Sequence, residues 1–337
     1  MNTLAPLPWQ TSQWQAVSTA QQRGALHHAW LLSGSEGVGK RSFVRAWVAT
    51  LLCEQVDAQQ QACGGCNSCK MLASGGHPDA HLLSNDGHLG LSTDAALQNE
   101  EGLSYWTPKS TSMRRDIAVD AARSLIEKLS VTSHRGGMRV VVIHPASNMS
   151  DGTANALLKT IEEPPARTLL LFVTVFPQGL KQTIRSRCQQ LRFATPSKGE
   201  ALSWLYGAHP NADAVLLAEA GGAPLKAAAW LASGESKRRE LWRKTLQQVA
   251  ERKTDPLQAA AELAREKGEA GEVLRLWQTQ MQLQLHESGV WSARHESFHA
   301  MLLDGLRRLE DHNANAQLLF ESLLLRWRLL AALPASA

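Results

Sequence analysis

Short, uninterrupted apolar runs mark the strands that the first half of the chain predicts. They lie at 28–32 (HAWLL), 139–143 (RVVVI) and 169–175 (LLLFVTV). Such runs, rich in β-branched residues and bounded by polar segments, are typical of strands buried on both faces of a parallel sheet. A helix with one apolar face is expected after the second strand, because apolar residues recur there at i, i+3, i+4 and i+7: Ala154, Leu157, Leu158 and Ile161.

The order of the elements predicts an α/β domain followed by helices. Strands and helices alternate through about residue 194, which favours a parallel sheet covered by helices. A small helical lid and then helices alone are expected further on, and 84–115 is predicted to be an exposed loop because it loses periodicity. A length of 337 residues suits two or three domains. We expect three, at 1–194, 195–234 and 235–337.

A glycine-rich loop follows the first predicted strand. Its sequence, GSEGVGK, matches the first seven positions of the P-loop, with Gly34, Gly37, Gly39 and Lys40 at the motif-bearing places. Such glycines let backbone N–H groups converge on phosphate, and the lysine reaches the outer phosphates. The eighth position should carry a hydroxyl for magnesium, but it is Arg41. Two interpretations stay open: weak phosphate or nucleotide binding without a metal site, or a turn that merely joins strand to helix.

The residues after the strand at 139–143 bear on hydrolysis. In nucleotide-hydrolysing α/β proteins, a carboxylate at the end of such a strand holds magnesium, and a second group orients the attacking water. Here the two positions are His144 and Pro145. The sequence therefore predicts the architecture of an ATPase without its acids.

Four of the five cysteines are clustered in the pattern C-x9-C-x2-C-x2-C: Cys53, Cys63, Cys66 and Cys69. Four thiolates in a short stretch suit tetrahedral zinc, and a closed four-sulfur site would be structural. Four free thiols, or a zinc module that reads DNA, are the alternatives.

Composition narrows the class of protein. Hydrophobic residues make up 44% of the chain, charged residues 20%, and the net charge is +4. This balance permits contact with nucleic acid without demanding it. The sequence has no run of about 18 apolar residues, so no membrane span is predicted. The N-terminus does not look like a signal peptide. Together with the free cysteines, this favours a reducing, cytoplasmic location.

Three further motifs carry a resemblance over roughly residues 20–195. They are NALLKT at 155–160, EEPP at 162–165 and Ser-Arg-Cys at 186–188. With the glycine-rich loop, the chain resembles the clamp-loader AAA+ ATPase family of bacterial DNA replication, on the side of its non-hydrolysing subunits. The resemblance implies a P-loop-type domain with a zinc module, a lid, and a helical collar domain for oligomerisation.

The same resemblance implies a role and partners. Arg187 would act in trans as an arginine finger in a neighbouring subunit's ATP site. The partners would be the ATPase subunits (gamma/tau) and the delta subunit, with the sliding clamp and primed DNA reached at least indirectly. Thr174 and Leu225 fall at places where active relatives sense nucleotide. An ordinary surface arginine, paired in a salt bridge, is the alternative for Arg187.

Two other functions remain as alternatives. An active clamp-loader ATPase of the gamma/tau kind needs Asp-Glu at 144–145 and Ser or Thr at position 41, which the sequence lacks. A zinc-dependent DNA-binding module needs basic and aromatic residues around the cysteines. The stretch 54–75 offers Lys70 and no aromatic residue.

Overall fold

A computed structural model describes residues 4–91, 116–131, 133, 137–265, 268–289, 292–312 and 314–331. The chain divides into two compact units. Unit 1 comprises Met1–Asn211 and Ala220–Ala232, and unit 2 comprises Ala212–Glu219 and Ser233–Ala337. Each unit is described by itself. This division leaves the three predicted domains, with boundaries after residues 194 and 234, as predictions.

Unit 1 contains the strands and the helices that pack on them. Its elements are η1 (Pro8–Gln10), α1 (Thr11–Gln22), β1 (Ala29–Gly34), α2 (Lys40–Leu52), α3 (Asn67–Ala73), β2 (Ala80–Ser84), β3 (Gly87–Gly90), α4 (Val119–Ser130), β4 (Arg139–Ile143), η3 (Ala146–Asn148), α5 (Asp151–Glu162), β5 (Thr168–Thr174), η4 (Pro177–Gly179), α6 (Gln182–Arg185), β6 (Gln189–Phe193), α7 (Lys198–Ala208) and α9 (Pro224–Ser233).

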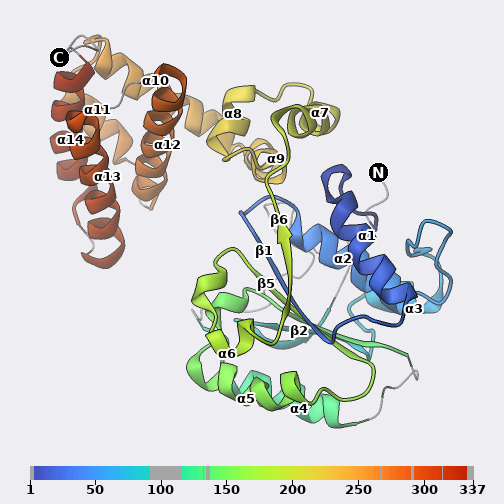
Figure 1. Ribbon diagram of the computed structural model, residues 1–337. Helices are drawn as coiled ribbons and strands as arrows, with labels where there is room; N and C mark the ends of the chain where they lie inside the picture. Colours follow the sequence, from blue (N-terminus) through green and yellow to red (C-terminus); the bar gives the residue numbers. More distant parts are fainter. Residues whose placement is uncertain are drawn as a thin grey trace. The chain divides into compact units, whose positions relative to one another are not determined.

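The described strands form one sheet in the order β3-β2-β4-β5-β1-β6 (Figure 1). Neighbours are parallel throughout except for β2 and β3, which form an antiparallel hairpin. The strands expected at 28–32, 139–143 and 169–175 are β1, β4 and β5, side by side at its centre. The predicted fold class, an α/β domain with a parallel sheet followed by helices, is confirmed.

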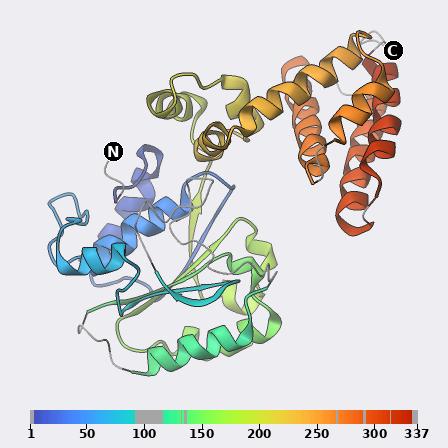
Figure 2. The same ribbon diagram turned by 180° about the vertical axis from the view of Figure 1, so that it is seen from behind.

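Alternate residues of each central strand enter two different cores, because successive side chains of a strand point to opposite faces. Trp30 and Leu32 pack with helices α1, α2 and α3 on one face. Ala29 and Leu31 pack with α4, α5 and α6 on the other. Figure 2 shows the sheet between the blue helices and the green ones. This double burial explains why the strands read as continuous apolar runs.

The predicted exposed loop at 84–115 needs a correction. Residues 87–90 of that stretch form strand β3, which pairs with β2 in the register Leu82↔Leu89. Gly87 has a φ of +110°, which a glycine adopts without strain, so the hairpin turn fits the sequence. The rest of the loop, from 92 to 115, lies outside the described residues.

Unit 2 is helical throughout its described part. Its helices are α8 (Ala214–Glu219), α10 (Glu235–Ala250), α11 (Pro256–Leu263), α12 (Ala270–Ser288), α13 (Ala293–His312) and α14 (Ala316–Ala331). Helices α10 to α14 share a core in which the rings of Trp277, Phe298 and Trp327 pack together. None of the described helices has the length and apolarity needed to cross a lipid bilayer.

Candidate functional site

Lys40 of the P-loop forms hydrogen bonds within the loop. The loop begins at the end of β1, and α2 begins at Lys40. The Nζ atom of Lys40 donates to the carbonyl oxygens of Gly34 and Ser35, each at 2.7 Å. The side chain is buried, and burial is the main cause that lowers the pKa of Lys40 to about 8. The ammonium group of Lys40 is therefore hydrogen-bonded to carbonyl groups of the loop itself.

Two segments far away in the sequence lie on this loop. From the N-terminal side, Gln10 Nε2 donates to the carbonyls of Val38 and Gly39 at 3.2 and 2.9 Å. From the other side, the Leu225 N–H donates to the Gly37 carbonyl at 3.2 Å. A Cβ atom at Gly37 would lie 2.5 Å from the Cβ of Lys226, so the position is closed to other residues. Leu225, which falls where active relatives carry a sensing arginine, thus contacts the loop through its backbone N–H.

The mouth of β4 confirms that the acids are replaced. His144 follows the strand and lines a cavity of about 220 Å³ together with Lys40 and Arg41. Burial, with the charges of Arg41 and Lys40, lowers the pKa of His144 to about 3, so this imidazole is neutral at pH 7. Among the described residues that line the cavity, Glu36 is the only acid, and it pairs with Lys226 at 3.2 Å. The arrangement can attract phosphate, but the ends of the described strands place no carboxylate in this cavity for magnesium, and its one acid, Glu36, is paired with Lys226.

Thr174 at the end of β5 is engaged with its own backbone. It is buried, and its Oγ1 accepts a hydrogen bond from the Phe176 N–H at 3.0 Å. This is the geometry of a packed residue that ends a strand, so the described contacts of Thr174 favour a structural role.

The four cysteines meet in space, as their spacing predicts. The four Sγ atoms of Cys53, Cys63, Cys66 and Cys69 lie within 4.8 Å of one another. Cys53 Sγ is 3.5 Å from that of Cys63 and 4.0 Å from that of Cys66. A tetrahedron with Zn–S bonds of about 2.3 Å requires sulfurs about 3.8 Å apart. The four sulfur donors and their spacing fit zinc, which these four thiolates would coordinate.

Backbone N–H groups already point at the sulfurs. In each C-x2-C turn the second cysteine donates to the first: Cys66 N to Cys63 Sγ, and Cys69 N to Cys66 Sγ, both at 3.4 Å. Such bonds favour the thiolate. Backbone N–H groups of Gly65 and Cys66 are the main cause that lowers the pKa of Cys63 to about 7. Burial raises the pKa of Cys69. The cluster therefore combines a thiol with a lowered pKa, Cys63, and a buried thiol with a raised pKa, Cys69.

Arg187 lies just past the end of α6 with its side chain at the surface. It sits between Ile184 and Cys188, which are both buried. Arg187 Nη2 is 2.6 Å from Glu162 Oε1, and Nη1 donates to the Thr183 carbonyl at 2.8 Å. The alternative interpretation of Arg187 was an ordinary surface arginine in a salt bridge, and that salt bridge is present in this chain. A role in trans remains a separate question.

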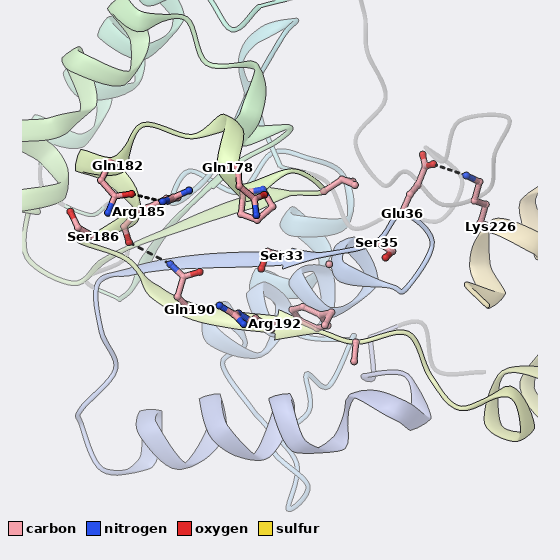
Figure 3. Close-up of a pocket in the computed structure, with 15 residues that line it drawn as sticks. Ser33, Ser35, Glu36, Gln178, Gln182, Arg185, Ser186, Gln190, Arg192 and Lys226 are labelled. Atoms are coloured by element: carbon pink, nitrogen blue, oxygen red, sulfur yellow. Dashed lines mark hydrogen bonds and ion pairs between the residues drawn. The ribbon is translucent and has the colours of Figure 1, made fainter. Parts of the chain in front are cut away.

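An open groove of about 1140 Å³ runs beside α6 along the ends of β1 and β6 (Figure 3). Ser33 and Arg192 are register partners and therefore share a face of the sheet there. Arg185 and Lys226 add positive charge to the lining, and Lys226 pairs with Glu36. The lining mixes apolar and polar residues, and its basic side chains, Arg185, Arg192 and Lys226, outnumber its one acid, Glu36.

Comparison with known proteins decides the family. The family described as DNA polymerase III, delta subunit, matches residues 9–197, more than half of the chain. The chain belongs to this DNA polymerase III family. Its resemblance to bacterial replication proteins, seen first in the motifs, is confirmed.

Curated relatives of this DNA polymerase III family member carry related names. The DNA polymerase III subunit delta' of Pseudomonas aeruginosa is 37% identical over 224 residues, which cover 65% of this chain and 60% of that protein. The delta' subunit of Escherichia coli is 33% identical over 198 residues, covering 59% and 52%. The tau subunit of Escherichia coli is 31% identical over 188 residues, covering 56% and 25%. The chain thus spans about half to three fifths of the delta' relatives' length.

Sequence reasoning missed the residues that support these sites. Gln10 and Trp9 bond the P-loop from outside it, and no local motif marks them. Ser68 and His77 form a buried hydrogen bond beside the cysteines. The signal in the sequence was a serine between the last two cysteines of the cluster.

Proposed function

We propose that this chain is a non-hydrolysing subunit of the DNA polymerase III clamp-loader complex. The observation that carries the proposal is the set of side chains around the P-loop cavity, which is lined by Lys40, Arg41, His144 and Pro145. The positions for magnesium and for the water-orienting group hold Arg41, His144 and Pro145. Phosphoryl transfer depends on metal and on a positioned nucleophile, and these side chains provide neither.

In the complex, the chain would supply Arg187 to the ATP site of a neighbouring subunit. Support comes from the surface position of its guanidinium, which is held by a solvent-exposed ion pair with Glu162 and a hydrogen bond to the Thr183 carbonyl. Arginine suits the role because its planar fork stays charged and pairs two phosphate oxygens. The neighbour would be a gamma/tau ATPase, with the delta subunit in the same assembly. Loading of the sliding clamp on primed DNA would follow from the neighbour's ATP turnover.

The helical C-terminal region, 235–337, would join the subunits as a collar. An apolar stripe on α14 supports this, since Leu318, Leu325 and Leu329 share one helical face and are exposed. The lid predicted at 195–234 would contact the P-loop through Leu225, whose N–H donates to the Gly37 carbonyl. We place the protein in the cytoplasm, at the replisome.

Zinc at the four cysteines would be structural. The site has four protein ligands and therefore no open coordination position for chemistry. The DNA-reading alternative finds little support, because Lys70 is the only basic residue in 54–75 and no aromatic residue lies there. An active ATPase of the gamma/tau kind is the second candidate, which the likeness to tau favours.

ATP turnover by the isolated chain separates the two candidates. We expect no steady-state hydrolysis above a buffer blank, and turnover only after partner subunits are added. Lys40→Ala is the control, because an active site in this chain would depend on that lysine. Hydrolysis by the isolated chain that disappears in Lys40→Ala would establish the active ATPase instead.

A further inference from the structure

A buried chain of hydrogen bonds runs beside the four cysteines. The Asp79 N–H donates to His77 Nδ1 at 3.1 Å, so the proton of the neutral imidazole sits on Nε2. His77 Nε2 lies 2.8 Å from Ser68 Oγ, to which it donates. Ser68 Oγ then donates to the carbonyl oxygen of Leu52. Ser68 Oγ thus accepts one hydrogen bond from His77 and donates one to Leu52, so it links the two residues.

The relay joins the ends of three elements that carry or flank the ligands. Leu52 is the last residue of α2 and directly precedes Cys53. Ser68 lies in α3, between Cys66 and Cys69. Asp79 directly precedes β2, which belongs to the central sheet. The relay therefore fixes α2 and α3 to each other and to the sheet at the point where three of the four thiols emerge.

Burial makes this relay worth more than an exposed hydrogen bond. Ser68 and His77 are 1% and 4% exposed. The last carbonyls of a helix have no partner within the helix, and Ser68 satisfies the one at Leu52. Removing the hydroxyl would remove both of these hydrogen bonds from a buried position, which is costly. Cys63, by contrast, is exposed and lies on the loop that precedes α3.

We propose that the Ser68–His77 relay positions Cys53, Cys66 and Cys69 for metal before the metal binds. Cys63, on the loop, completes the site. Ser68 and His77 are positioning residues, since neither belongs to the four candidate ligands. A prearranged site loses less conformational freedom on binding and releases its ion more slowly. Partners that orient metal ligands typically change affinity by about 10–100-fold.

The test uses the full chain loaded with zinc and measures release to the chromophoric chelator 4-(2-pyridylazo)resorcinol. Ser68→Ala and His77→Phe remove the relay while nearly keeping side-chain volume, and we expect release at least about tenfold faster. Ser68→Thr keeps the hydroxyl and should release zinc at close to the wild-type rate. Ser74→Ala is the matched control, because its Oγ bonds only the nearby Met71 carbonyl in an exposed position.

A second readout separates positioning from general support of the fold. Zinc raises the melting temperature according to its affinity for the folded chain. The gap in Tm between zinc-bound and metal-free protein should narrow in Ser68→Ala and His77→Phe, but not in Ser74→Ala. A role in folding alone would lower both melting temperatures together and leave the gap intact. An unchanged gap, or release rates equal to that of Ser74→Ala, overturns the proposal. If Ser68→Ala does not fold, His77→Phe and Ser68→Thr give the same comparison.

Discussion

Arg187 is held by Glu162 through an ion pair of 2.6 Å that stays open to solvent. The two side chains are 39% and 48% exposed. Glu162 ends α5, and Arg187 follows α6, so the pair also joins two motifs of the resemblance. Exposed pairs contribute only about 0–1 kcal/mol, because water screens them. The guanidinium can therefore exchange Glu162 for a more highly charged anion, such as a phosphate, at small cost.

Removal of Arg187 should barely affect folding. Arg187→Ala is expected to change the free energy of unfolding by less than about 1 kcal/mol, since only an exposed pair and one surface hydrogen bond are lost. Urea unfolding of the isolated chain measures this, with zinc content checked in parallel. A loss of several kcal/mol would make Arg187 a structural residue.

Gly37 should tolerate no side chain. The residue has φ +75°, and an added Cβ would meet Lys226 at 2.5 Å. Gly24 is the matched control, with φ +64° and no atom within 4 Å of an added Cβ. We expect Gly24→Ala to cost about 1 kcal/mol from backbone strain, and Gly37→Ala about 1–3 kcal/mol more from overpacking. Equal losses in urea unfolding would mean that α9 does not close on the P-loop.

His144 gives the stability a defined dependence on pH. Its folded pKa is lowered, to about 3, while an unfolded histidine titrates near 6.5. The unfolded chain therefore binds the extra proton between these values, and the contribution to stability, full above about pH 6.5, is lost as pH falls toward 3. Relative to His144→Gln, the wild type should lose stability by up to about 1.4 kcal/mol per pH unit below 6.5. Parallel pH curves for the two proteins would contradict the assignment; thiol protonation is common to both and cancels.

The four-cysteine cluster should hold close to one equivalent of zinc in purified protein. Removing the metal leaves four close thiols without the ion that links α2 to α3, so the metal-free chain should melt at a lower temperature. Elemental analysis and thermal melting before and after chelation measure both quantities. A metal-free protein that melts at the zinc-bound temperature would deny zinc a structural role.

How far the sequence predicts this fold depends on burial. β1, β4 and β5 were predictable because both faces of each are covered, which leaves an unbroken apolar run. β6 is an edge strand with the sequence QQLRF, and three of its five residues are exposed. β3 has no buried residue among its four. Such short, mostly polar stretches carry no periodic signal, so only the finished sheet identifies them.

The candidate site, too, was predictable from the sequence only in part. The cysteine cluster followed from spacing, because all its ligands lie within one short stretch. The closure of the P-loop could not follow, because it depends on Gln10, Leu225 and Lys226, which arrive from opposite ends of unit 1. A motif predicts which groups a loop carries, whereas their hydrogen-bond partners come from packing.

Arg187 in the assembled complex gives the most direct test of the account. The measurement is ATP turnover and clamp loading by complexes reconstituted with gamma/tau and delta subunits, with assembly checked by size. Arg187→Ala should lower both rates, because in the proposed role the guanidinium would stabilise charge that grows in the transition state. The loss would be partial if the ATP sites fire independently and severe if they fire as a set. Arg187→Lys should rescue poorly, since one ammonium cannot replace the fork.

The matched control is Arg123→Ala, another exposed arginine in an ion pair, 3.2 Å from Asp120 on α4. It should leave both rates at the wild-type level. Arginine fingers contribute on the order of a thousandfold at the site they serve. The account predicts slowed ATP turnover in the fully assembled Arg187→Ala complex alone. Equal rates for Arg187→Ala, Arg123→Ala and wild type would contradict it and leave Arg187 a surface arginine.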